Sequence, residues 1–263
     1  MTAPTLLLSA LLGLCLVFTA CYGLARRMDN YGVVDIVWSY SFAVLALYYA
    51  SFGPGWTVRK ALIATMAVLW GLRLGTHLYR RVLAHHPVED GRYVQLRQDW
   101  AGNFAKRMFG FFQLQAASVV LLGTAFFVTC LNPVPRLHSL EVAGAALWLF
   151  ALSGEALADS QLAAFKGNPT HQGQVCDVGL WRYSRHPNYF FEWLVWLAYF
   201  VFALASPWGW LAVIGPGSIL YLLLRVTGIP LTEQQALRSK GDAYRRYQQT
   251  TSAFVPWFPR HLP

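Results

Sequence analysis

A polar, cationic stretch at residues 179–192, Gly-Leu-Trp-Arg-Tyr-Ser-Arg-His-Pro-Asn-Tyr-Phe-Phe-Glu, runs directly into a strongly apolar segment. Pro187 suits the first turn of a helix, where its missing N–H leaves no intrahelical hydrogen bond unmade, so a helix is predicted to begin there. Arg182, Arg185 and His186 come immediately before that helix N-terminus, which itself attracts anions. The stretch therefore predicts a binding site for a polyanionic ligand.

Two pairs of polar residues at a spacing of four belong to the same site. Asn188 and Glu192 share one face of the predicted helix, and Glu155 and Asp159 share a face near the end of an earlier apolar segment. In each pair the spacing of four points both side chains the same way.

Six ionisable residues fall inside or at the ends of apolar segments. They are Asp35, Arg73, Glu155, Asp159, Glu192 and Arg225. All six lie in the same half of the predicted membrane topology, whereas a proton pump or ion channel needs ionisable groups through the midplane. The pattern predicts a pocket that opens to one side of the membrane.

The chain that holds these residues has the amino-acid composition of an integral membrane protein. Of 263 residues, 56% are hydrophobic and 13% are charged, against about 25% charged in an ordinary soluble domain. The net charge of +9 comes mainly from arginines at the ends of apolar segments, so membrane orientation explains it better than nucleic-acid binding does.

The apolar pattern predicts a single all-α transmembrane domain, residues 1–263, with seven transmembrane helices. The predicted spans are residues 4–24, 33–52, 57–79, 105–131, 138–160, 188–205 and 208–228. Long loops at 80–104 and 161–187 and a C-terminal segment, 229–263, with an amphipathic helix at about 231–249, complete the predicted cytosolic side.

The distribution of cations orients this topology. Of the 21 Lys and Arg residues, 18 fall on the side reached after the odd-numbered spans, and only Arg59, Lys60 and Arg136 fall on the other. The positive-inside rule then predicts a multi-pass membrane protein with the N-terminus outside and the C-terminus in the cytoplasm.

No metal site is predicted. The four cysteines have neither metal-ligand nor disulfide-framework spacing, and the adjacent His85 and His86 point apart and have no partner at carboxylate–histidine spacing. We interpret the cysteines as small buried residues plus one exposed thiol, with Cys176 in a loop, and the two histidines as solvated loop residues.

With these residues in view, the chain resembles the steroid 5-alpha-reductase family, in its bacterial branch. The resemblance rests first on residues 179–192, with Asn188 and Glu192, and on a preceding match, Glu155-x-x-x-Asp159-x-Gln161-x-x-x-Phe165-Lys166. A third match follows, Glu233-x-x-x-Leu237 with Gly241-Asp242-x-Tyr244-x-x-Tyr247, and looser matches are Trp70-Gly71-Leu72-Arg73 and Glu89-Asp90-Gly91-Arg92-Tyr93.

The resemblance implies NADPH in a cytosolic cavity, with Asn188 and Glu192 toward the nicotinamide amide and Asp159 toward the adenosine. Lys166, Arg92 and Arg225 would take phosphates, which agrees with the positive charge that a ribose 2'-phosphate requires. The further cofactor-binding candidates are Glu155, Tyr183, Arg185, His186 and Glu233.

For the reaction, the resemblance implies hydride transfer to the C=C bond of an α,β-unsaturated ketone in a lipophilic substrate, a 3-oxo-4-ene steroid or another enone lipid. An acid must meet the charge that develops on the ketone oxygen, and Asp35, with a pKa raised by apolar surroundings, is the predicted donor. Arg73 and His77 mark the region aligned with the family's second donor, a tyrosine, which we do not find there.

An S-adenosylmethionine-dependent methyltransferase of the isoprenylcysteine or phospholipid type is the first alternative, and a non-catalytic lipid-binding or transport protein is the second. The methyltransferases share the Arg-His-Pro-x-Tyr core and the C-terminal Tyr-x-x-Tyr pattern in a related helical fold. Asn188 paired with Glu192 favours the reductase, and the expected partners are therefore a lipophilic small molecule and membrane lipids, with no nucleic acid.

Overall fold

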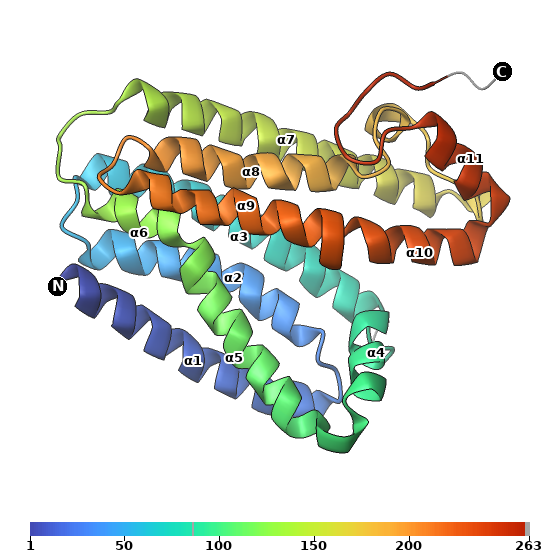
Figure 1. Cartoon of the computed structure of the whole chain (residues 1–263), viewed down its shortest axis with the longest axis horizontal. Helices are drawn as coiled ribbons and strands as arrows, with labels where there is room; N and C mark the ends of the chain where they lie inside the picture. The colour runs from blue at the N-terminus through green and yellow to red at the C-terminus, as the bar shows by residue number, and fades with distance from the viewer. Residues whose placement is uncertain (86, 261–263) are drawn as a thin grey trace. The chain divides into compact units, whose positions relative to one another are not determined.

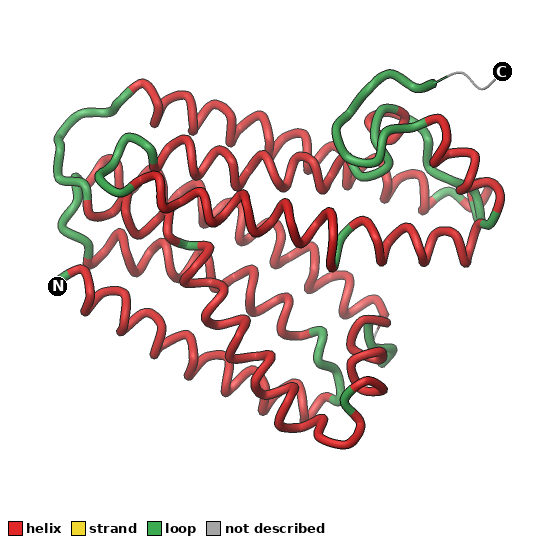
Figure 2. The backbone as a smooth tube through the Cα atoms, viewed as in Figure 1, coloured by secondary structure: helices red, strands yellow, loops and turns green. Residues whose placement is uncertain are grey.

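The structure, a computed structural model, describes residues 1–85 and 87–260, without the side chain of His85. In this part of the chain every regular element is a helix and no strand is formed (Figure 2). The helices group into two compact units, residues 1–138 with 203–212, and residues 139–202 with those from 213 onward. The prediction for the adjacent histidines falls outside the described residues.

Six helices make up most of the first unit (Figure 1). They are α1 (Ala3–Met28), α2 (Val33–Phe52), α3 (Thr57–His85), α4 (Gly91–Asp99), α5 (Phe104–Leu122) and α6 (Thr124–Leu131). Helices α2 and α3 pack closely because glycines face the contact: a Cβ added at Gly75 would lie 2.6 Å from the Tyr40 ring. The Tyr40 hydroxyl also hydrogen-bonds Thr76 Oγ1 at 3.0 Å.

The predicted span at 105–131 is bent rather than straight. Helices α5 and α6 meet at Gly123 with a bend of 41°. A Cβ at Gly123 would approach Leu45 Cδ2 to 2.6 Å, so the missing side chain allows α2 to pack against the bend.

The second unit contains α7 (Ser139–Gly167), α8 (Pro187–Ala203), α9 (Ile214–Tyr221), α10 (Ile229–Lys240) and α11 (Asp242–Thr250). Helices α7 and α8 pack antiparallel, since Gly144 lies against Phe202 and Gly154 against Phe191. The start of α8 at Pro187 confirms the helix start predicted from that proline.

The chain after α9 departs from regular α-helix twice. A π-helical segment, Leu222–Val226, joins α9 to α10, and Gly241 with φ of +52° separates α10 from α11. The prediction of one amphipathic helix at 231–249 is therefore wrong, because a glycine adopts this left-handed conformation at no steric cost. Figure 1 shows α11 turning away from the line of α10.

The polar stretch 80–104 was predicted as a loop and is mostly helical. Helix α3 continues to His85, and α4 begins after Asp90, whose side chain accepts a hydrogen bond from the Arg92 N–H at 3.0 Å. A capped helix satisfies backbone groups that a loop of this length would leave to water.

The apolar helices are those of a multi-pass membrane protein. Five helical segments of the described chain are long and apolar enough to cross a bilayer, and the bent pair α5–α6 makes a sixth. Helix α8 has 17 residues, about 25 Å at 1.5 Å per residue, which is short of a hydrocarbon core of about 30 Å. The seven-span topology therefore stays a prediction.

Candidate functional site

The first candidate site surrounds Asp35 in the first turn of α2, where the helix N-terminus favours a negative charge. Arg92 Nη2 ion-pairs with Asp35 Oδ2 at 2.7 Å, and the Tyr93 hydroxyl donates a hydrogen bond to Asp35 Oδ1 at 2.8 Å. Asp35, Asp90, Arg92 and Tyr93 form what we call the Asp35 cluster. It brings a carboxylate, a guanidinium and a phenol together.

Helix α4 positions the arginine and the tyrosine. Asp90 caps its N-terminus and also receives Arg92 Nε at 3.2 Å and Arg81 Nη2 at 2.7 Å. Burial alone would raise the pKa of Asp90, but Arg92 outweighs this and lowers it. The cap therefore stays ionised at neutral pH and fixes the direction of the Arg92 side chain.

Tyr93 is the buried member of the Asp35 cluster, with 2% of its surface exposed. Burial and the neighbouring charge of Asp35 raise the pKa of its phenol well above the usual value. Tyr93 thus keeps its proton over the physiological range and acts as a hydrogen-bond donor.

A second set of contacts ties α4 to the connection between α1 and α2. Arg97 ion-pairs with Glu89 and Asp29, each at 2.7 Å, and lies 4.8 Å from the centre of the Tyr31 ring. Glu89 Oε1 in turn accepts the Tyr31 N–H at 2.7 Å. These contacts hold α4, and hence Tyr93, beside the start of α2.

The structure changes the interpretation of four predicted residues. Asp35 lies in a polar, ion-paired environment rather than the apolar one expected, and among described residues its side-chain partners are Arg92 and Tyr93. Arg73 is half-buried and His77 exposed on α3, and neither is a partner of Asp35. Arg92, predicted to take a phosphate, here neutralises a carboxylate, so its phosphate role stays a prediction.

The second unit contains a denser cluster around Glu233 of α10. Glu233 accepts hydrogen bonds from Arg185 Nε at 2.6 Å, Gln248 Nε2 at 2.7 Å, His186 Nε2 at 3.2 Å and the Tyr244 hydroxyl at 3.5 Å. These five residues form the Glu233 cluster. Because the carboxylate of Glu233 is fully hydrogen-bonded to protein donors, the cluster mainly stabilises the packing of helices α10 and α11 against the start of α8.

Hydrogen bonds to backbone groups connect the Glu233 cluster to the C-terminal segment after α11. Arg185 Nη1 donates to the carbonyl oxygens of Gln248 at 3.0 Å and Thr251 at 2.6 Å, and the Arg185 N–H donates to Ser252 O at 2.8 Å. The Trp257 N–H donates to Tyr183 O at 2.8 Å. Arg185 and His186 therefore already have protein partners, and their cofactor contacts stay predictions.

The start of α8 presents the group of polar residues that best fits a carboxamide. Asn188 Nδ2 donates to Asp159 Oδ1 at 3.3 Å, while Asn188 Oδ1 is buried and has no hydrogen-bond partner among the described residues. Glu192, one turn later, accepts the Trp196 indole N–H at 2.8 Å. A buried acceptor without a partner is costly, so a ligand that donates an N–H to Asn188 would be stabilised here.

The remaining predicted cofactor residues vary in exposure. Glu155 is 4% exposed, whereas Lys166 at the end of α7 and Arg225 in the π-helical segment are exposed. Tyr183 is 38% exposed and makes an edge-on ring contact with Phe258, with ring centroids 6.1 Å apart. Lys166 and Arg225 thus stay accessible to an anion.

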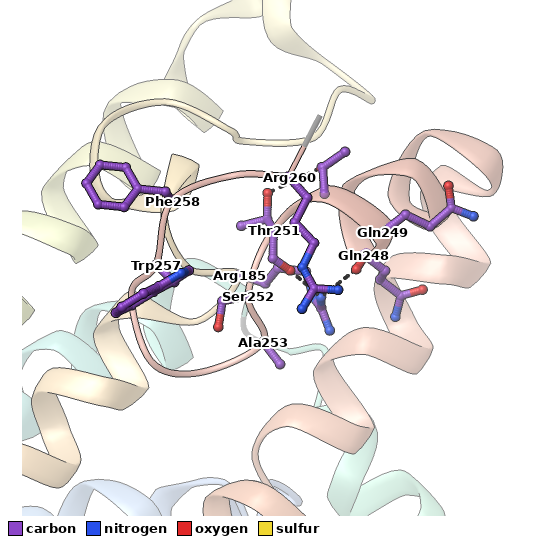
Figure 3. Close-up of a pocket in the computed structure, with 10 residues that line it drawn as sticks. Arg185, Gln248, Gln249, Thr251, Ser252, Ala253, Trp257, Phe258 and Arg260 are labelled. Carbon is purple, nitrogen blue, oxygen red and sulfur yellow. Dashed lines mark hydrogen bonds between the residues drawn. The ribbon is translucent and has the colours of Figure 1, made fainter. Parts of the chain in front are cut away.

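A cavity of about 350 Å³ lies in the second unit between Arg185 and the C-terminal segment (Figure 3). Its lining comprises Arg185, Gln248, Gln249, Thr250, Thr251, Ser252, Ala253, Trp257, Phe258 and Arg260. Apart from Arg185, sequence reasoning assigned no function to these residues. The one available signal was the aromatic–proline–arginine tail at 257–260, which has no periodicity to mark it as part of a site.

Tyr93 is the other functional candidate that sequence reasoning missed, although it stands in the stretch 89–93 that carries a loose family match. No cluster of His, Cys, Asp and Glu in the described part of the chain could hold a metal ion. All four cysteines are free.

Comparisons with known proteins agree with these observations at the level of the family. An uncharacterised protein of the fission yeast Schizosaccharomyces pombe is 27% identical over 95% of this chain and 78% of its own length. No solved structure matches the chain. The family model described as a protein of unknown function, DUF1295, matches residues 21–251, and the chain belongs to this family, which is related to the steroid 5-alpha-reductases.

Proposed function

We propose that this protein is a membrane-embedded, NADPH-dependent reductase of the C=C bond in an α,β-unsaturated ketone carried by a lipophilic substrate. The family relationship makes a 3-oxo-4-ene steroid the natural probe substrate. The distribution of cations supports a C-terminus in the cytoplasm, and the resemblance to the bacterial branch of the family supports a location in the bacterial inner membrane.

The hydrogen bond from Tyr93 to Asp35 carries this proposal. Enone reduction needs a donor for the oxygen on which negative charge develops, and the Asp35 cluster supplies a buried phenol that keeps its proton. A methyl transfer from a sulfonium donor adds no proton to the acceptor. The cluster is therefore better explained by a reductase.

The residues at the start of α8 support the cofactor. The buried, partnerless Asn188 Oδ1 fits the N–H of a carboxamide, and the Glu192 carboxylate one turn away is a further acceptor for the same group. When bound, reduced nicotinamide supplies a hydride to the β carbon of the enone. Lys166 and Arg225, both exposed, are the candidates for its phosphates.

Tyr93 supplies the proton that the substrate oxygen takes, and Arg92 stabilises the negative charge that is then left on Tyr93. As the β carbon gains the hydride, the C=C electron pair moves toward the carbonyl oxygen, which takes the phenolic proton of Tyr93. The guanidinium of Arg92, 5.5 Å from the centre of the Tyr93 ring, stabilises the resulting phenolate, and water returns the proton to it. The enol then takes a proton at its α carbon and loses one from oxygen, so the substrate gains one hydride and one proton.

The test is ligand binding by the purified, full-length protein in detergent. We expect NADPH to raise the melting temperature and S-adenosylmethionine to leave it unchanged, and we expect a steroid enone to consume NADPH, measured at the reduced-nicotinamide absorbance band. A thermal response to S-adenosylmethionine alone would instead establish the methyltransferase.

A further inference from the structure

The C-terminal segment after α11 is fixed against the second unit on one side. The Phe254 ring packs against two rings of α8, Phe190 and Trp193, with centroids 5.7 and 6.0 Å away. Nearer the end of the segment, the Arg260 N–H donates a hydrogen bond to Thr250 O at 2.8 Å. The course of the backbone between these contacts is therefore set by the second unit itself.

Large apolar side chains on the other side of this segment are exposed. Val255 is 52%, Trp257 69% and Phe258 75% exposed. The Phe258 ring makes edge-on contacts with Trp257 and with the half-exposed Tyr183, and Figure 3 shows Trp257 and Phe258 on the same side of the segment. We call Tyr183, Val255, Trp257 and Phe258 the aromatic patch. Contiguous exposed apolar side chains mark a surface that meets a membrane or another protein.

The depth of the aromatic patch follows from the length of α7. This helix has 29 residues, and about 20 residues counted from Ser139 cross a hydrocarbon core of about 30 Å. The count puts the far boundary of the core near Ala158, whose carbonyl oxygen accepts the Trp181 indole N–H at 2.9 Å. Trp257 is tied to the same turn, because its N–H donates to Tyr183 O at 2.8 Å. The patch therefore lies where hydrocarbon meets lipid headgroups, a depth at which Trp and Tyr are enriched.

The charges around the aromatic patch are positive. Arg182 directly precedes Tyr183, Arg260 follows Phe258 by two residues, and both arginines are exposed and have no ion-pair partner among the described residues. Residues 243–260 contain three arginines and no carboxylate. Exposed aromatic side chains with uncompensated guanidinium groups complement a layer of anionic lipid headgroups, since guanidinium groups bind phosphate oxygens in pairs.

We propose that the aromatic patch is an anchor that inserts into the headgroup region of the adjacent leaflet, with Arg182 and Arg260 on the phosphates of anionic lipids. The charge and the depth of the patch favour this occupant over a second copy of the chain or a soluble protein. The anchor holds the C-terminal segment, and with it the backbone carbonyl oxygens that Arg185 binds, at the membrane surface. The proposal does not depend on the reaction that the protein catalyses.

The first experiment measures the depth of residue 258 in the full-length protein, reconstituted in bilayers of phosphatidylglycerol and phosphatidylcholine. Phe258→Cys carries a nitroxide in a background with Cys15→Ala, which removes the one native thiol that is not buried. We expect the nitroxide to collide more often with oxygen, which concentrates in the bilayer, than with a water-soluble nickel chelate. The matched label at Asp242→Cys, a position whose side chain is 80% exposed at the start of α11, should show the reverse.

The second experiment titrates the full-length protein in detergent with a short-chain phosphatidylglycerol and follows the bound lipid by native mass spectrometry. One arginine at an anionic lipid surface contributes a factor of about five in affinity, so Arg260→Gln should lose about fivefold and Arg182→Gln with Arg260→Gln about 25-fold. Arg246→Gln, which removes an exposed arginine of α11 outside the patch, should change the affinity by less than about twofold. The melting temperature of each variant shows that it is folded.

Three results would overturn the proposal. A nitroxide at residue 258 that collides mainly with the nickel chelate places the patch in water, and shielding from both reagents indicates a protein partner or a second copy. Unchanged lipid affinity in folded Arg260→Gln removes the arginine from the site. Glycerol 1-phosphate has the phosphate without acyl chains, and its displacement of the lipid would show a site for a free anion instead.

Discussion

The Asp35 cluster and the Glu233 cluster are built from the same kinds of group, a carboxylate with an arginine and a tyrosine, but they differ in how the carboxylate is satisfied. Asp35 has two partners, from one short helix, and 21% of its side chain is exposed. Glu233 has four donors from two segments, the connection before α8 and helix α11, and its arginine also binds two backbone carbonyl oxygens. The number of hydrogen bonds that each carboxylate accepts separates the two clusters. A carboxylate with few protein partners can still contact a substrate, whereas one with many protein partners stabilises the fold.

The largest expected effect comes from removing the donor of the Asp35 cluster. Tyr93→Phe should lower turnover by about 10²- to 10⁴-fold, the usual contribution of a positioned general acid, because only the hydroxyl is lost. Asp35→Ala should abolish turnover as well. NADPH affinity, measured by titration, should not change in either variant.

The corresponding change in the Glu233 cluster provides the contrast. Tyr244→Phe removes the longest of the four contacts to Glu233, at 3.5 Å, and should leave turnover within about twofold of the unmodified protein, because a bond at this length is weak. Equal losses of turnover in Tyr93→Phe and Tyr244→Phe would contradict the different roles that we assign to the two clusters.

The next effect is on stability. Glu233→Ala leaves Arg185, whose side chain is 11% exposed, without its carboxylate and should destabilise the second unit by about 2 to 4 kcal/mol. Asp35→Asn removes an ion pair whose side chains are more exposed, 33% for Arg92 and 21% for Asp35, and should cost about 1 kcal/mol or less. Thermal unfolding in one detergent measures both, and a larger loss for Asp35→Asn would contradict this assignment of roles.

The smallest effect concerns the cap of α4 and its pH dependence. The pKa of Asp90 is lower in the folded protein than in the unfolded chain, so its ionised form stabilises α4 above the unfolded pKa, and this contribution is lost as pH falls through the folded pKa. Asp90→Asn should remove the pH dependence and cost about 1 kcal/mol at most, since asparagine still caps a helix. Hydrogen exchange of the α4 amides at pH 7 and at about pH 2 measures it, because the loss occurs below the unfolded pKa of about 4, and equal protection at both pH values would contradict it.

Sequence reasoning located the start of α8 because the geometry of proline is a local signal. It could not pair Tyr93 with Asp35, which are 58 residues apart in the chain. That pairing depends on α4, whose polar composition gives no apolar periodicity and whose start is set by the Asp90 cap. Likewise, Gly241 and Gly123 broke predicted helices through a backbone angle and a close approach that composition does not show.

Deuterium transfer tests the central claim most directly. The purified protein is incubated with a lipophilic enone and NADPH that carries deuterium at the transferable position of the nicotinamide, and the product is examined by mass spectrometry and NMR. We predict a saturated ketone with one deuterium at the β carbon, and almost none from Tyr93→Phe at equal protein and equal NADPH occupancy. A product without deuterium, or methyl transfer from labelled S-adenosylmethionine in its place, would contradict the account.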